Sequence, residues 1–407
     1  MKSRSFTTNF AALAALAYAA LTPVAAEASP PADWKTPPGW TQTRGGEGGK
    51  TVLVTTLSAK GPGSLRAALE TDGARVVEFS IAGTINLEGR SLKASHPHLT
   101  IAGETAPSPG ITLVNGGLGI STHDVIVRHL RIRPGAGNRA KKSGWEVDGL
   151  ATNAAHDVIV DHCSITWSTD ENLSASGPRF EGKTPEEWRK NTSHRITFSH
   201  CLIGEGLHDS THSKGPHSKG SLIHDNTSDI AIIGNLYISN HDRNPLFKGG
   251  ARGVIVNNLI HNPGRRIISY GLSPGEWGTH EWQRGSMTII GNVARCGPST
   301  DRQVAFLNAS GPCDVHLADN LYFNAEGEPL PVAVKTASKP LHNVRMSDTP
   351  PNWPPSLTAR PAEKTAEWVL ANAGARAWER DKTDQRLIEE ARTGGGKIIH
   401  FESEVSD

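Results

Sequence analysis

The sequence has almost no net charge and no strongly charged block. Its 407 residues include 42 Lys and Arg against 41 Asp and Glu, for a formal net charge of +1. That balance excludes the basic field with which proteins attract nucleic acids and anionic membranes. We therefore expect neither nucleic acid nor a membrane among the partners.

Long apolar runs are absent after the first 28 residues, so no later segment is expected to cross a membrane. The start of the chain has Lys2 and Arg4, then an Ala- and Leu-rich run over residues 11–21. A small-x-small site follows at residues 26–28, which is typical of a signal peptide. The apolar run is short for a membrane anchor. We predict that residues 1–28 are a signal peptide and that the protein is secreted or periplasmic.

Cysteine is scarce, with four residues in the chain. Disulfides persist in exported proteins, and Cys296 and Cys313 flank one loop, so these two could pair. Cys163 and Cys201 end two copies of a repeat described below, and we expect them to be buried thiols. Free core cysteine is the alternative for all four.

A short phrase recurs along the chain. It has three or four apolar or β-branched residues, then His or Asn, then usually an apolar residue or Cys. Its spacing varies between 23 and 38 residues, which is too irregular for a solenoid of helices. The phrases are rich in Val and Ile and are bounded by Gly, Asn and Pro, as strands are. The His or Asn positions are His129, His162, His200, Asn235, Asn258, Asn292 and Asn320.

A parallel β-helix explains the variable spacing. The shortest step, 23 residues, sets the length of a bare coil, and longer steps carry loops. Equivalent residues of neighbouring coils stack about 4.8 Å apart. The seven His and Asn positions are therefore predicted to form one column, in which Asn side chains hydrogen-bond along the stack. We predict an all-β, single-domain right-handed parallel β-helix.

The ends of such a stack need caps. Residues 64–70 read as an amphipathic N-terminal capping helix. Residues 29–345 are assigned to the β-helix, and residues 346–407 to a C-terminal tail that packs on it. Within and before this tail, residues 340–361 are Pro-rich and expected to be irregular, whereas 365–378 and 382–392 are predicted to be helices.

The longest steps place extra residues in loops near 177–193, 208–220 and 264–285. Binding sites are often built from such loops on a rigid scaffold. Counting eight residues past four successive column positions reaches Asp170, His208, Arg243 and Arg266. If each coil turns alike, these side chains line up on one side of the stack. A carboxylate, a histidine and two arginines in a row favour a site for an anionic ligand, and a solvated surface row is the alternative.

Three segments resemble one known family. NHDRNPLFKGG (240–250) resembles the R-x-P-x-x-R motif of the pectate lyase superfamily, polysaccharide lyase family 1. VIVDHCSITWSTDENLS (158–174) resembles its I-D-H-C strand and acidic turn, and HSKGPH (212–217) a segment of its bacterial branch. The likeness covers nearly the whole mature chain and implies a polysaccharide lyase that cleaves a polyuronate, most simply pectate, by calcium-dependent β-elimination.

The resemblance also implies roles for individual residues. Arg243 falls on the catalytic base, and Lys248 falls on a basic position that binds the substrate. Lys214 falls near a lysine that contacts the uronate carboxylate. Asp148 and Asp170 fall on Ca²⁺ ligands, and Glu146 on a further acidic position. Ser174 stands where the family often has another acid. Glu171 is the nearest replacement, although its side chain is expected to point differently.

Some alternatives remain open at this level. His208 or His212 offers a conventional base in place of arginine, whose guanidinium normally stays protonated; otherwise they, like Arg266, would contact substrate. The uronate could be alginate, glucuronan or ulvan. A non-catalytic carbohydrate-binding β-helix would not need the aligned row. A glycoside hydrolase would need paired carboxylates, and no close Asp pair with a Gly-His-Gly-type loop is present. We expect a monomer that acts on an acidic polysaccharide.

Overall fold

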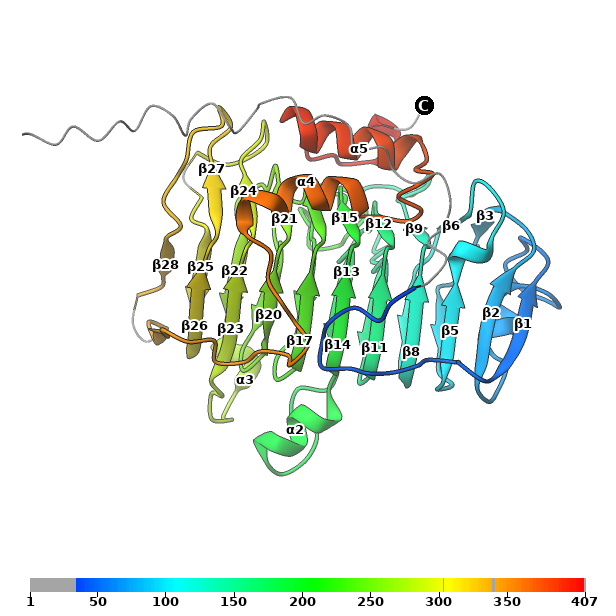
Figure 1. Cartoon of the computed structure of the whole chain (residues 1–407), viewed down its shortest axis with the longest axis horizontal. Helices are drawn as coiled ribbons and strands as arrows, with labels where there is room; N and C mark the ends of the chain where they lie inside the picture. Colours follow the sequence, from blue (N-terminus) through cyan, green and yellow to red (C-terminus); the bar gives the residue numbers. More distant parts are fainter. Residues whose placement is uncertain (1–33, 303, 339–340, 406–407) are drawn as a thin grey trace, which may run out of the picture.

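Three parallel sheets make up most of the protein. The computed structural model describes residues 34–302, 304–338 and 341–405. Successive strands enter the three sheets in turn, so the chain winds as a stack of coils (Figure 1). The predicted parallel β-helix is therefore confirmed. The predicted signal peptide, residues 1–28, lies outside the described residues. Within the described ranges, no helix is long and apolar enough to span a bilayer.

Sheet 1, the eleven-stranded sheet, contains the repeated Val- and Ile-rich phrases. Val158, Ile196 and Ile230 are register partners on three neighbouring strands and are fully buried. Such β-branched side chains pack well on a pleated surface, which is why these phrases form strands. The strands of sheet 1, in spatial order, are β1 (Lys50–Val54), β2 (Arg75–Phe79), β5 (Leu99–Ala102), β8 (His123–Arg128), β11 (His156–Asp161), β14 (His194–Ser199), β17 (Ser228–Ile233), β20 (Arg252–Val256), β23 (Gly285–Ile290), β26 (Cys313–Ala318) and β29 (Val344–Met346).

Sheets 2 and 3 have shorter strands, because bends follow one another closely around each coil. Sheet 2 contains β3 (Gly83–Asn86), β6 (Ile111–Val114), β9 (Arg131–Arg133), β12 (Ser164–Thr166), β15 (Leu202–Gly204), β18 (Leu236–Ile238), β21 (Leu259–His261), β24 (Val293–Arg295) and β27 (Leu321–Phe323). Sheet 3 contains β4 (Leu92–Ala94), β7 (Leu118–Ile120), β10 (Leu150–Asn153), β13 (Leu173–Ser176), β16 (Leu222–Ile223), β19 (Leu246–Lys248), β22 (Ile268–Gly271), β25 (Leu307–Ser310) and β28 (Val334–Thr336).

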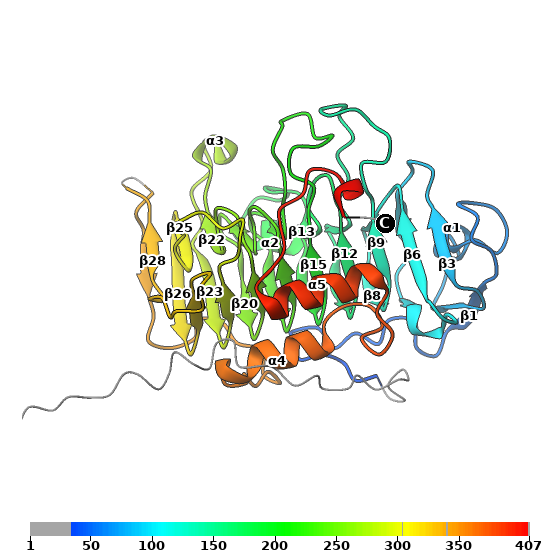
Figure 2. The same cartoon turned by 90° about the horizontal axis from the view of Figure 1, so that it is seen from above.

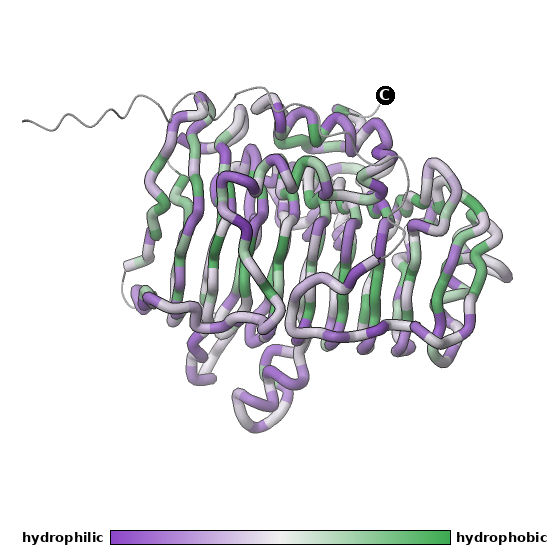
Figure 3. Tube along the Cα trace, in the orientation of Figure 1, coloured by the Kyte–Doolittle hydropathy of each residue, from purple (hydrophilic) through white to green (hydrophobic). Residues whose placement is uncertain are grey.

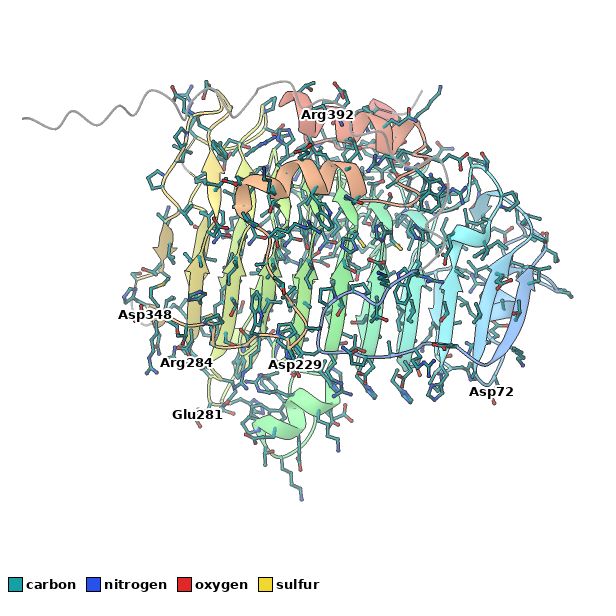
Figure 4. The ribbon with its side chains drawn as sticks, in the orientation of Figure 1. Asp72, Asp229, Glu281, Arg284, Asp348 and Arg392 are labelled. Atoms are coloured by element: carbon teal, nitrogen blue, oxygen red, sulfur yellow. The ribbon has the colours of Figure 1, made fainter. Side chains whose placement is uncertain are left out.

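The core lies inside the coils and consists of side chains that alternate along each strand. Val158 and Val160 of β11 point into it, as period-two patterning requires. The other side of sheet 1 is covered in part by Trp40 and Trp353, which pack against buried residues of β17 and β20. Hydrophobic residues accordingly follow the strands in Figure 3, whereas charged side chains such as the labelled Asp72 lie at the rim in Figure 4.

The prediction of a single polar column is wrong in one respect, because the His and Asn positions form two adjacent columns. Two residues separate sheet 1 from sheet 2 in each of these coils. The register of β14 to β17 and of β15 to β18 places Gly234 beside His200, and Asn235 beside Cys201. The three histidines stack on one another one position before the asparagines. The cysteines at this bend, not the histidines, continue the asparagine column.

The four asparagines form a hydrogen-bonded ladder, as predicted. Asn235 Nδ2 donates to Asn258 Oδ1 at 3.0 Å, and Asn258 Nδ2 donates to Asn292 Oδ1 at 2.9 Å. Asn292 Nδ2 in turn donates to Asn320 Oδ1 at 3.0 Å. The backbone N–H of Cys201 donates to Asn235 Oδ1 at 2.8 Å, where the ladder ends. Each amide thus satisfies backbone groups that the bend would otherwise leave without partners.

Asn258→Ala is expected to lower the free energy of unfolding by about 2–3 kcal/mol. The Asn258 side chain accepts the backbone N–H of Asn235 at 2.9 Å and donates to Ile232 O at 3.0 Å, and both partners are buried. Urea unfolding followed by circular dichroism measures the change. The exposed Asn138→Ala variant is the control, with an expected change within about 0.5 kcal/mol. Equal stability of Asn258→Ala and wild type would contradict the structural role of the ladder.

One helix lies at the N-terminal end of the stack, and the others lie along its sides. Capping helix α1 (Leu65–Leu69) confirms the N-terminal prediction, with Ser64 Oγ accepting the N–H of Ala67. Helix α4 ends before the predicted Trp378, and β29 interrupts the segment predicted to be irregular. Helix α5 lies where it was predicted. The remaining elements are α2 (Pro185–Asn191), α3 (Pro274–Trp277), α4 (Ala362–Asn372), α5 (Lys382–Thr393) and the 3₁₀ turns η2 (Gly103–Thr105) and η3 (Glu402–Glu404).

The C-terminal helices lie along sheet 2 and cross several coils (Figure 1). Leu202, Leu236 and Leu259, one from each of three successive strands, form an apolar row beneath α4 and α5. Asp381, the N-cap of α5, pairs with Arg133 of β9 at 2.7 Å. The tail is therefore fixed to the stack by apolar packing along its length and by an ion pair at the start of α5.

All four cysteines are free and buried. This confirms the prediction for Cys163 and Cys201, and burial raises the pKa of the Cys201 thiol. The suggested pairing of Cys296 with Cys313 is wrong. Cys313 begins β26 in sheet 1, whereas Cys296 follows β24 in sheet 2, with its Sγ 3.5 Å from the Tyr322 hydroxyl. The two thiols flank one loop in sequence but belong to different sheets.

Candidate active site

A groove of about 660 Å³ lies over sheet 3. Helix α3 and neighbouring loops project from the side of the stack opposite α4 (Figure 2). Each of five neighbouring strands contributes at least one residue to the groove, so the groove extends on the order of 20 Å along the stack. Those residues include Leu222, Leu246, Ser269, Asn308 and Lys335. The charged residues of its wall include Asp170, Glu171, Lys214, Arg243, Lys248 and Arg266.

The row obtained by counting eight residues is only partly reproduced. Asp170, Arg243 and Arg266 line the groove together. His208 does not line the groove. Its ring lies 4.3 Å from that of His241, and its backbone N–H donates to the carbonyl oxygen of Ile399 in the C-terminal tail. The count fails there because the loop after β15 leaves the coil. The residue that forms a β-bridge with Glu171 of the preceding coil is Lys219, which comes after this loop.

Arg243 lies in the bend between β18 and β19, in a left-handed backbone conformation with φ of 62°. Its Nη1 pairs with a carboxylate oxygen of Glu171. Burial lowers the pKa of Arg243 below its ordinary value; Asp170 and Asp148 oppose this shift, and the nearby Arg265 and Arg266 add to it. The side chain keeps 23% of its surface exposed, so its guanidinium is accessible from the groove.

Three carboxylates meet beside Arg243. Single oxygens of Asp148, Asp170 and Glu171 all lie within 4.8 Å of one another. Burial, together with the charge of Asp170, raises the pKa of Asp148 to about 8. Burial acts to raise the Asp170 pKa, but the hydrogen bond with His217 and the charges of His217, His212 and Arg243 together outweigh it and leave that pKa below its ordinary value. Glu146 lies at the edge, where its hydrogen bond from the Ser213 hydroxyl lowers its pKa.

This carboxylate cluster fits a hard divalent cation such as Ca²⁺, which prefers oxygen ligands. The raised pKa of Asp148 reflects the cost of burying carboxylates together, a cost that a bound cation removes. Ser174 is buried in β13 and pairs with Ala151 of β10, and it contributes no acid. Glu171, which was expected to point away, joins the cluster instead.

Two lysines reach the groove from different elements. Lys214 lies on the loop before β16, and Lys248 ends β19. Lys248 Nζ lies 3.3 Å from buried Asp225 and pairs with Glu276 of α3. Asp225 and Glu276 were not predicted. The only sequence signal for Glu276 was the length of the 264–285 loop, and none pointed to Asp225.

His212 is buried beside the carboxylate cluster, stacked on His217 with ring centroids 3.6 Å apart. The His212 Nδ1 accepts the backbone N–H of Lys214 at 3.1 Å. His217 Nε2 lies 2.8 Å from Asp170 Oδ1. The H-S-K-G-P-H segment therefore curls around Asp170, with both of its histidines facing the carboxylates. Arg266 is less enclosed, with its Nη1 3.4 Å from Asp242.

Comparison with known proteins gives a consistent set of relatives. The chain is 30% identical over 365 residues to the probable pectate lyase C of Emericella nidulans, covering 88% of this chain and 76% of that protein. It is 31% identical over 358 residues to the probable pectate lyase C of Neosartorya fischeri, covering 87% and 75%. No protein-family model matches the chain.

Solved structures agree on the fold. The cedar-pollen allergen Jun a 1 superposes with a TM-score of 0.54 at 16% identity, over 83% of this chain and 92% of that one. A pectate lyase bound to a hexasaccharide superposes with a TM-score of 0.54 at 13% identity, over 84% and 97%. At these identities the structures support the parallel β-helix alone.

Proposed function

The chain belongs to the pectate lyase family, and on that premise we propose that it cleaves a polyuronate, most simply polygalacturonate, by calcium-assisted β-elimination. The observation that carries the proposal is the contact of Arg243 with a three-carboxylate cluster at one wall of a long open groove. A groove that spans several coils suits a polymer. The mixture of cations and carboxylates in its wall suits uronate units together with a divalent cation.

In β-elimination a base removes the proton from carbon 5 of a uronate. The electrons of that C–H bond form the double bond to carbon 4, and the bond from carbon 4 to the glycosidic oxygen breaks. The leaving oxygen keeps the bonding pair and takes up a proton. The product chain therefore carries a 4,5-unsaturated uronate at its new end, and no water is consumed.

We assign the base to Arg243. Burial and the neighbouring Arg265 and Arg266 lower its pKa, which increases the small population of neutral guanidine that can accept a proton. His212 is a weaker candidate, because it is only 2% exposed and its Nδ1 already accepts a hydrogen bond. His208 lies outside the groove lining. Its contribution as a base or a substrate contact therefore has little geometric support.

The acidity of carbon 5 depends on stabilising the charge that develops on the uronate carboxylate. Lys214, Lys248 and Arg266 line the groove and are assigned to bind uronate carboxylates there. Asp148, Asp170 and Glu171 would hold Ca²⁺, with Glu146 at the edge of the site. Bound calcium would withdraw electron density from the carboxylate next to carbon 5. Three protein carboxylates leave room for substrate and water among its six to eight ligands.

A substrate panel tests the activity. Purified protein is incubated with polygalacturonate, alginate, glucuronan and ulvan, and the ultraviolet absorbance of the unsaturated product is followed with added calcium. We expect absorbance to rise with polygalacturonate. A rise with another polyuronate alone would change the substrate but keep the reaction. New reducing ends without absorbance would indicate a hydrolase. No cleavage of any polymer would indicate a non-catalytic carbohydrate-binding protein.

A polymer substrate of this kind lies outside the cell, so we also propose that the protein is exported and that residues 1–28 serve as its signal peptide. The basic start and the short apolar run support this assignment. N-terminal sequencing of the protein recovered outside the cytoplasm would locate the cleavage site.

A further inference from the structure

Two candidate metal-binding clusters share the carboxylate of Asp170. The first contains oxygens only, from Asp148, Asp170 and Glu171. The second combines Asp170 with His212 and His217, whose ligand atoms also lie within 4.8 Å of one another. The proposed function uses the first cluster and leaves the second without a role.

The second cluster brings three possible ligand atoms together. Asp170 Oδ1 lies 2.8 Å from His217 Nε2 and 3.7 Å from His212 Nε2. The two imidazoles are stacked with an interplanar angle of 17°, and a metal bonds in the plane of an imidazole ring, so one ring must tilt out of this stack for both to bind one ion. Neighbouring ligands in a tetrahedral zinc site are about 3.4 Å apart, because metal–ligand bonds are about 2.0–2.1 Å. The observed separations bracket that value.

The chemistry of the donors separates the two clusters. Two imidazole nitrogens and one carboxylate suit Zn²⁺ and similar transition-metal ions, whereas Ca²⁺ takes oxygen ligands. Both histidines are held by burial: His212 is 2% and His217 9% exposed. Ligands that are already ordered lose little freedom when a metal binds.

A carboxylate also lies beside the other ring nitrogen of His212. Its Nδ1 lies 3.5 Å from Glu146 Oε1. When Nε2 binds a metal, the ring proton must be on Nδ1, and a carboxylate beside that atom is the usual acceptor. The hydrogen bond that Nδ1 now accepts from the Lys214 N–H would be replaced by one that it donates to Glu146.

We propose that Asp170, His212 and His217 form a second metal site that takes a transition-metal dication of the Zn²⁺ class, and that this ion competes with Ca²⁺ for Asp170. Binding itself does not depend on the lyase reaction. The inhibitory consequence rests on the proposed function, since an Asp170 carboxylate that is coordinated to zinc would no longer be available to calcium.

Isothermal titration of metal-free protein with ZnCl₂ or with CaCl₂ alone tests this, without substrate. The variants are His217→Gln and Asp148→Asn. Gln keeps a donor near Asp170 but removes the imidazole, whereas Asn removes a carboxylate of the oxygen cluster only. We expect His217→Gln to weaken zinc binding at least tenfold and calcium binding less than threefold. Asp148→Asn should do the reverse, and zinc should weaken calcium binding to the wild type.

Two other clusters are competing zinc sites, because the ligand atoms of each lie within 4.8 Å of one another. They are His98 with His123 and Asp124, and Asp161 with His162 and His200. His123→Gln and His200→Gln are therefore the matched controls, expected to leave the tightest zinc site intact. Loss of that site in either control and not in His217→Gln would overturn the proposal. So would parallel loss of zinc and calcium in both His217→Gln and Asp148→Asn.

The two proposals can fail separately. Zinc binding that depends on His217, in a protein that cleaves no polyuronate, would overturn the proposed function alone. Lyase activity with zinc affinity unchanged in His217→Gln would overturn the second metal site alone. Retained calcium binding in His217→Gln serves as the check that the variant is folded.

Discussion

Arg243→Ala is expected to lower kcat on polygalacturonate by about 10²–10⁴-fold, the usual contribution of a general base. The guanidinium lies against the carboxylate cluster, and burial lowers its pKa. Calcium affinity should fall far less than kcat, since arginine is not a metal ligand. Initial rates of ultraviolet absorbance and calorimetry with calcium measure the two quantities.

Arg265→Lys is the matched control for Arg243→Ala. Arg265 pairs with Asp242 at 2.5 Å and does not line the groove, and its charge helps to lower the pKa of Arg243. Lysine keeps that charge, so this variant should change kcat by no more than a few-fold. Wild-type kcat in Arg243→Ala would refute the assignment of Arg243 as the base and would favour His212 in that role.

Removal of calcium is expected to have an effect of similar size. Chelator should reduce the rate to background, and added calcium should restore it. Without calcium, the negative charge that develops on the uronate carboxylate during proton removal is less well stabilised. Asp148→Asn should weaken calcium binding about tenfold or more, as loss of a charged ligand does. Calorimetry and the calcium dependence of the rate check both statements.

Glu146→Gln is the comparison variant, because Glu146 lies outside the three-carboxylate cluster and is largely solvated. Its calcium affinity should change less than that of Asp148→Asn. Full activity in chelator would contradict a calcium requirement, and a larger loss in Glu146→Gln would move the centre of the site toward the rim of the groove.

The fold was predictable because its coils repeat a local pattern. Val and Ile phrases and the asparagine ladder follow from side chains that each coil must bury or satisfy. The exact composition of the ladder was not predictable, because the histidine and asparagine phrases look alike while differing by one position in register. A shift of one residue moves a side chain to another column, and strand pairing alone reveals it.

The site was predictable where no insertion intervenes. Asp170, Arg243 and Arg266 share the groove because each lies a short distance past its own bend. His208 was misplaced because the loop that contains it leaves the coil. Asp225 and Glu276 contact Lys248 from segments distant in sequence, and no local sequence pattern predicts such ion pairs. The clustering of His217 with Asp170 is of the same long-range kind.

The C-terminal tail ties together coils that would otherwise open independently. In a stacked repeat each coil contacts only its neighbours, so local openings can begin at either end and spread. The tail breaks this rule: Asp384 accepts from Ser164 on β12, Arg386 pairs with Glu205 after β15, and Gly395 O contacts His261 on β21. Coils several steps apart are thereby joined by one segment, and the middle of the stack becomes a single cooperative unit. The part of the groove floor on β16, β19 and β22 lies on coils of this unit, so it is expected to keep its shape when the ends of the stack open locally.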